Sequence, residues 1–107
     1  MPTLDEDHRY YVYAVELSPA AAQRHADRAL VRRGARVYYV GHTAHTTANR
    51  LANHLWGGHT SNGAVHRHAR GVVGHVGPFR SRDEAERQER RWARRIRRLG
   101  HVVIGGH

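Results

Sequence analysis

The segment VYYVGHTAHTTANRLANHL, residues 37–55, gives the strongest indication of the fold. Its first four residues are aromatic or β-branched, which is typical of a strand, and Gly41 ends the run. The stretch TTANRLANHLWGG, residues 46–58, begins with threonines suited to an N-cap and ends at two glycines, so we predict a helix there. Arg50 and His54 share one side of that helix because they lie four residues apart. A strand that ends in a tyrosine is thus followed by a helix that carries an arginine and a histidine.

The first part of the chain carries one strand pattern and one helix pattern. YYVYAVEL, residues 10–17, alternates its side chains in the manner of a strand. SPAAAQRHADRALVRRG, residues 18–34, has Ser18 as N-cap and Pro19 at the first helical position, so we predict a helix of about four turns. SNGAVHRHARG, residues 61–71, predicts a weaker helix.

The C-terminal part predicts an edge strand, a long helix and a short final strand. GVVGHVGPF, residues 71–79, contains glycines and a proline, which suit an edge strand. SRDEAERQERRWARRIRRLG, residues 81–100, opens with Ser81 and Glu84 in capping-box spacing. HVVIGGH, residues 101–107, can add a short final strand. We therefore predict an α/β (α+β) fold, with a small three-stranded, mainly antiparallel sheet flanked by helices.

The length of 107 residues predicts one domain with a modest core. We expect residues 1–8 to form a flexible acidic tail and residues 9–107 to form the domain. The absence of cysteine excludes disulfides and thiolate metal sites. The N-terminus lacks the basic start and apolar run of a secretory signal, and no apolar stretch approaches the roughly 20 residues that a membrane span needs. We therefore expect a soluble, cytoplasmic protein with no membrane partner.

The charge balance favours a polyanionic partner. All 18 basic residues are arginines, against 9 acidic residues, so the formal charge is +9. Such a charge attracts polyanions, chiefly nucleic acid. A coding bias toward G and C explains the choice of arginine over lysine equally well, but it explains the sign of the charge less well.

Glu89 occupies an unusual position on the predicted helix of residues 81–100. At about 100° per residue, Glu89 lies about 40° from Ala85, on the helix's apolar side. The seven arginines from Arg87 to Arg98 lie on the far side, where solvation is the simpler explanation, and we place no active site there. A carboxylate that faces the domain body is costly unless a cation or donors meet it, so Glu89 needs a metal ion or an arginine partner. The predicted apolar stripe comprises Ala85, Trp92, Ile96 and Leu99.

Five residues, taken in chain order, resemble the active-site set of the GIY-YIG nuclease superfamily, and the resemblance covers about residues 10–100. YVGHT followed by RLANH is its most specific part. Three features depart from the family pattern. The first motif reads YVY, with tyrosine where the family has glycine, residues 19–33 replace a short turn, and no asparagine follows the late helix. The five residues are Tyr13, Tyr39, Arg50, His54 and Glu89.

The resemblance implies a divalent-metal-dependent endonuclease whose five catalytic residues line one face of the sheet. Glu89 would hold Mg²⁺ or Mn²⁺, and a lone carboxylate suffices because Mg²⁺ usually keeps several waters. Arg50 offers a planar donor fork to a phosphate oxygen. Tyr13, Tyr39 and His54 are candidates to orient or deprotonate the attacking water. Of these groups, histidine has the better suited pKa, about 6.5.

The predicted partner is nucleic acid, DNA in preference to RNA. We assign nucleic-acid binding to four further residues: His42, His45, Arg67 and Arg70. A domain of this size has little surface for base readout, so a homodimer or a partner protein would supply targeting. Two alternatives remain open at this stage. One is a non-catalytic nucleic-acid-binding module on the same fold, and the other is a metal site among the eleven histidines, whose spacing shows no repeat.

Overall fold

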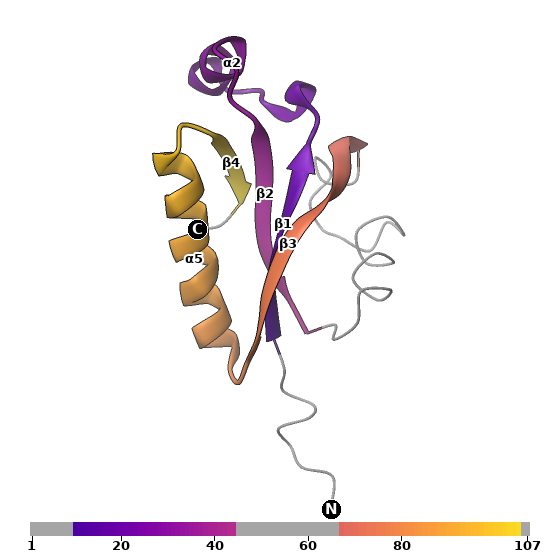
Figure 1. The fold of residues 1–107 in the computed structure, drawn as a ribbon, viewed down its shortest axis with the longest axis vertical. Coiled ribbons are helices and arrows are strands. Elements are labelled where there is room, and N and C mark those ends of the chain that lie inside the picture. The colour runs from indigo at the N-terminus through magenta and orange to yellow at the C-terminus, as the bar shows by residue number, and fades with distance from the viewer. Residues whose placement is uncertain (1–9, 45–66, 106–107) are drawn as a thin grey trace, which may run out of the picture.

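A computed structural model describes residues 10–44 and 67–105. It contains four strands in one sheet, in the order β3-β1-β2-β4 (Figure 1). The predicted helix of residues 46–58 lies outside the described residues. The strands are β1 (Tyr10–Leu17), β2 (Val37–Thr43), β3 (Ala69–Phe79) and β4 (Val102–Gly105).

The sheet is mixed and has four strands, because the short final strand that residues 101–107 could add is present as β4. β1 pairs antiparallel with both β2 and β3, which confirms the three predicted strands and places β3 at an edge. β4 then adds to the other side of β2 in parallel, with Val37 opposite Val102. The prediction of a three-stranded, mainly antiparallel sheet therefore holds for β1, β2 and β3, and the final strand makes a four-stranded mixed sheet. β3 begins at Ala69, so the weak helix predicted for residues 61–71 does not extend to its end.

The predicted helix of residues 18–34 is wrong as a single element. It consists of a short 3-10 helix, η1 (Pro19–Ala21), and a separate eight-residue helix, α2 (His25–Arg32). Ala21 and Ala22 are buried in the core, whereas α2 buries none of its residues completely. The extended conformations of Ala22 and Arg24 separate the two helices, so the buried alanines lie outside the longer helix.

Helix α5 (Arg82–Arg98) matches the prediction closely. The Ser81 side chain accepts a hydrogen bond from the backbone N–H of Glu84 at 3.1 Å, as the capping box predicts. Ala85 is fully buried, but Leu99 is 72% exposed, because the helix ends before it. Ala93 is fully buried instead. Across residues 10–44 and 67–105, neither α-helix has the length and apolar character to cross a membrane.

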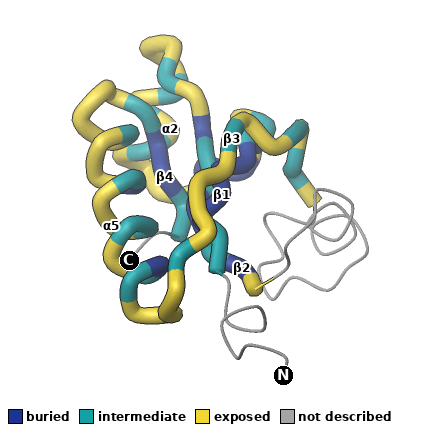
Figure 2. The backbone as a smooth tube through the Cα atoms, turned by 60° about the horizontal axis from the view of Figure 1, so that its bottom comes forward, coloured by how far each residue is buried: buried dark blue, intermediate teal, exposed yellow. Residues whose placement is uncertain are grey.

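The two faces of the sheet carry separate core clusters, and the buried residues follow β1, β2 and β4 (Figure 2). Side chains alternate along β1, so its odd-numbered and even-numbered residues contribute to different clusters. Helix α5 covers the second cluster and lies along one side of the sheet (Figure 1). The first cluster contains Tyr13, Val15, Leu17, Ala21, Ala22, Val37 and Val102, and the second contains Val12, Ala14, Val40, Ala85, Ala93 and Val103.

Candidate active site

Tyr13 and Tyr39 meet over Gly41. Tyr13 lies opposite Gly41 in the β1–β2 pairing, and Tyr39 precedes Gly41 by two residues on β2. The two ring centroids are 6.1 Å apart, with the planes tilted by 41°. A Cβ atom on Gly41 would lie 2.8 Å from Cε1 of Tyr39 and 2.9 Å from Oη of Tyr13, closer than real contacts allow. The glycine of the YVG motif is therefore required for space, since its backbone φ is not positive.

Both tyrosine hydroxyls are held in their neutral form. Burial is the main cause that raises the pKa of Tyr13, followed by the nearby Tyr39. Burial also raises the pKa of Tyr39, followed by the negative charge of Glu89. A hydrogen bond between the two side chains raises the pKa of Tyr13 and lowers that of Tyr39. At neutral pH both hydroxyls can donate hydrogen bonds, and neither is a ready base.

Glu89 faces the domain body, as the helical arithmetic predicts. Ala85 and Ala93, one turn away on either side, are fully buried, and the Glu89 side chain is only 13% exposed. Its Oε2 atom lies 3.1 Å from Nδ1 of His42, so the partner is a histidine rather than the arginine we considered. His42 reaches Glu89 because it lies two residues after Val40, whose side chain packs in the cluster under α5.

The described site residues lie on both faces of the sheet around β2, and not on one face as the resemblance implied. Tyr13 and Tyr39 pack in the first cluster, whereas Glu89 projects from the helix that covers the second. The charge of Glu89 is nevertheless one of the causes that raise the pKa of both tyrosines. His42, which we predicted to contact phosphate, lies beside Glu89, and its role in binding nucleic acid stays a prediction.

Arg67 and Arg70 lie near Leu17, at the end of β1 opposite Tyr10. Ala69, between them, pairs with Leu17, whereas Tyr13 pairs with His75 on the same strand. Both arginines are exposed, and the structure does not bring them to the tyrosines. Arg50, His54 and His45 lie outside the described residues. Within the described ranges, no group of three or more histidine, cysteine or acidic residues could hold a metal ion.

The His42–Glu89 contact is the feature of the site that the sequence interpretation missed. Alternation along β2 places His42 on the same side as Val40, and Glu89 was already known to need a partner. These two facts together could have identified the pair.

Comparison with known proteins finds no matching family model, no similar curated protein and no similar solved structure. The resemblance stated above therefore depends on this chain's own residues.

Proposed function

We propose that this protein is a divalent-metal-dependent endonuclease that hydrolyses phosphodiester bonds of nucleic acid, DNA in preference to RNA. The observation that carries the proposal is that β1 and β2 present the Tyr13–Tyr39 ring contact, with centroids 6.1 Å apart, on one face, and the His42–Glu89 contact, at 3.1 Å, on the other. A carboxylate that is only 13% exposed is costly for stability unless it is paired, and raised pKa values like those of the two tyrosines are common at functional sites.

The acid fits the role of a metal ligand. Within residues 10–44 and 67–105, Glu89 has one partner, His42 at Oε2, and the Oε1 atom remains available. A carboxylate ligand that is hydrogen-bonded to a neighbouring side chain is a common arrangement around metals. Mg²⁺ or Mn²⁺ bound at Glu89 would supply charge stabilisation and an activated water. His42 would be a positioning residue, which fixes the rotamer of Glu89.

The remaining roles follow from the chemistry of each side chain. The neutral hydroxyls of Tyr13 and Tyr39 are hydrogen-bond donors, suited to orienting the water or a phosphate oxygen. Neither tyrosine is suited to act as the general base in this environment, which leaves His54 as the better candidate. Arg50 would bind the phosphate through its planar fork. These last two roles come from the resemblance and are tested by Arg50→Ala and His54→Ala.

The alternative is a nucleic-acid-binding module without catalysis. The charge of +9 favours this function as strongly as it favours a nuclease, because phosphate binding alone requires only exposed cations. A homodimer or a partner protein would supply targeting in either case. The two proposals differ in Glu89, because binding tolerates its loss and cleavage does not.

The deciding experiment incubates the purified protein with labelled duplex, branched and single-stranded DNA and RNA. We expect cleavage with Mg²⁺ or Mn²⁺ and none with chelator. Glu89→Gln should abolish cleavage while salt-sensitive binding persists. Glu86→Gln is the matched control, because Glu86 pairs with Arg82 on the exposed side of the same helix. Cleavage that survives in Glu89→Gln would refute the catalytic role of Glu89.

A second measurement tests the metal independently of activity. If Glu89 holds the ion, Mg²⁺ or Mn²⁺ should raise the melting temperature of the wild type, since a ligand stabilises the state that binds it. The same ions should leave the melting temperature of Glu89→Gln unchanged. Equal shifts in both proteins would remove Glu89 as the metal ligand.

A further inference from the structure

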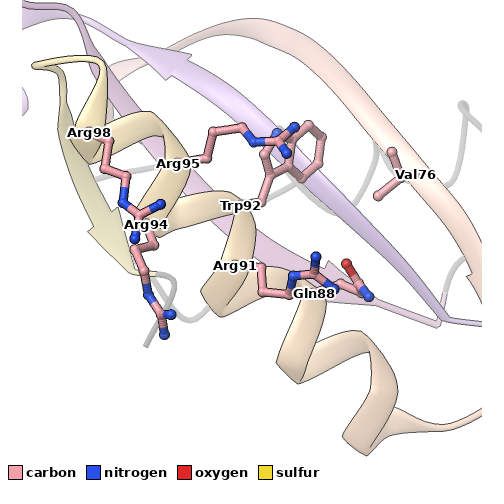
Figure 3. Close-up of a pocket in the computed structure, with 7 residues that line it drawn as sticks. All are labelled: Val76, Gln88, Arg91, Trp92, Arg94, Arg95 and Arg98. Carbon is pink, nitrogen blue, oxygen red and sulfur yellow. The ribbon is translucent and has the colours of Figure 1, made fainter.

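A basic groove lies on the β3 side of α5, away from Glu89. The groove has a volume of about 330 Å³. In Figure 3 the side chains of Arg91 and Arg95 extend from the helix toward the side on which Val76 of β3 lies. Trp92 forms its inner wall, because its ring approaches the backbone of β3 at Gly74. The lining residues are Val76, Gln88, Arg91, Trp92, Arg94, Arg95 and Arg98.

The lining contains four arginines and no acidic residue. Some arginines elsewhere in the described residues have partners within the protein. Arg36 lies 3.8 Å from Glu16, and Arg82 lies 3.2 Å from Glu86. Arg97 donates to two carbonyl oxygens of β4. For the four arginines of the groove, residues 10–44 and 67–105 supply no ion pair or side-chain hydrogen bond. Their positive charges are therefore free to interact with anions from solution.

The helix dipole explains only part of this arrangement. Cations in the last turn interact favourably with the C-terminal carbonyls, which accounts for Arg95 and Arg98. The dipole effect falls off within one turn, so it does not account for Arg91 and Arg94. Nor does it explain why the arginines flank a concave surface with a tryptophan wall.

We propose that this groove binds the phosphate backbone of nucleic acid. Guanidinium groups match phosphate oxygens through planar pairs of N–H donors. Arg91 and Arg98 are seven residues apart, which is about 10 Å along a helix axis. Successive phosphates of one strand advance about 3.4 Å along a duplex, so the row of arginines spans about three phosphates. The groove contacts backbone and no base edges, so the binding is independent of sequence.

The groove and the candidate active site lie on opposite flanks of one helix. Gln88 lines the groove and Glu89 contacts His42, so two consecutive residues point to different places. Nucleic acid in the groove would therefore be held beside the reacting centre and not in it. The binding proposal does not depend on the nuclease proposal, because it concerns affinity alone.

The test compares two double variants that remove the same charge from the same helix. Arg91→Gln/Arg95→Gln alters the groove, whereas Arg87→Gln/Arg90→Gln alters exposed arginines that do not line it. Affinity for a short DNA duplex is measured by fluorescence anisotropy at several salt concentrations. The groove variant should bind about tenfold more weakly, and its log-log salt slope should be smaller by about 1.8, or about 0.9 for each lost contact. The control should lose less than about threefold, with little change of slope.

A second pair of variants adds charge instead of removing it. Gln88→Glu places an acid in the groove, and Gln23→Glu adds the same charge at an exposed position outside it. Only Gln88→Glu should weaken duplex binding, and melting temperatures confirm that every variant is folded. Equal losses in both members of either pair would show that net charge alone matters and would overturn the proposal. Loss of binding to anionic lipid vesicles, with duplex binding intact, would assign the groove to membranes and would also overturn it.

Discussion

The two flanks of α5 hold opposite charges in opposite surroundings. On one flank, Glu89 is 13% exposed and is held by His42. On the other flank, Arg91 and Arg95 are exposed, and the groove that they line contains no acid. Cleavage needs a group in a fixed position and shielded from water, whereas binding a polyanion needs only cations within reach. If both proposals hold, one helix would provide the environment for each task by separating them around its axis.

The sharpest way to break this comparison is kinetic. Glu89→Gln should lower kcat by about 100-fold or more, because it removes an interaction that matters at the transition state. Arg91→Gln/Arg95→Gln should raise KM and leave kcat within about a factor of two. Steady-state cleavage of a labelled duplex measures both constants. An equal fall in kcat for the groove variant would show that the groove positions the substrate for reaction, and the division between the flanks would be lost.

The packing around the site predicts a second contrast, in stability. Gly41→Ala places a methyl group 2.8 Å from the Tyr39 ring, so we expect a loss of about 1–3 kcal/mol from overpacking, together with loss of cleavage. Gly74→Ala is the control on the groove side, where the new atom would lie 3.6 Å from Trp92 in ordinary contact. Urea unfolding of both variants gives the comparison. A Gly41→Ala protein as stable as the wild type would mean that the tyrosines are loosely packed.

The burial of Tyr13 predicts a dependence of stability on alkaline pH. The pKa of Tyr13 in the folded protein is raised above the ordinary value of 10.0, so the folded state retains a proton that the unfolded state releases. This contribution is complete below pH 10.0 and is lost as the pH rises through the folded-state pKa. The melting temperature of the wild type should therefore fall as the pH rises above 10.0, and the melting temperature of Tyr13→Phe should fall less steeply. Parallel curves for the two proteins would contradict the assigned burial of the hydroxyl.

The smallest effect belongs to an exposed pair on α5. Arg82 and Glu86 lie 3.2 Å apart with side chains 69% and 36% exposed, and such pairs contribute about 0.5 kcal/mol or less. Glu86→Gln should therefore leave both the unfolding free energy and cleavage nearly unchanged. A larger loss in chemical denaturation would disqualify Glu86 as the control for Glu89.

Local patterns were sufficient to predict most of the elements. The strands β1, β2 and β3 have the side-chain alternation or the edge composition that the sheet requires, and Ser81 caps α5 as its spacing indicates. The single helix predicted for residues 18–34 failed because burial of Ala21 and Ala22 depends on β1 and β2, which no local pattern contains. The prediction that Leu99 belongs to the apolar stripe was wrong because helical arithmetic does not show where the helix ends.

The candidate site was predicted in part. The position of Glu89 followed from the helical period alone, and Tyr13 and Tyr39 lie together as the resemblance implied. The partner of Glu89 was missed because His42 was interpreted by its place after the YVG motif and not by the side of β2 on which it lies. The basic groove was missed because it forms only where α5 packs beside β3, and the pattern of a single segment does not show how two segments pack.

The parallel pairing of β4 with β2 has a consequence for the order of assembly. β3 and β4 lie at opposite edges, and α5 connects them across both central strands. The paired residues Val37 and Val102 are separated by more than half of the chain, and such distant contacts close slowly. We expect amides of residues 102–105 to gain protection last in pulse-labelled hydrogen exchange, and early protection there would contradict this order. Because Gly105 lies against the Tyr39 ring, the tyrosine pair would be among the last parts of the core to become fixed.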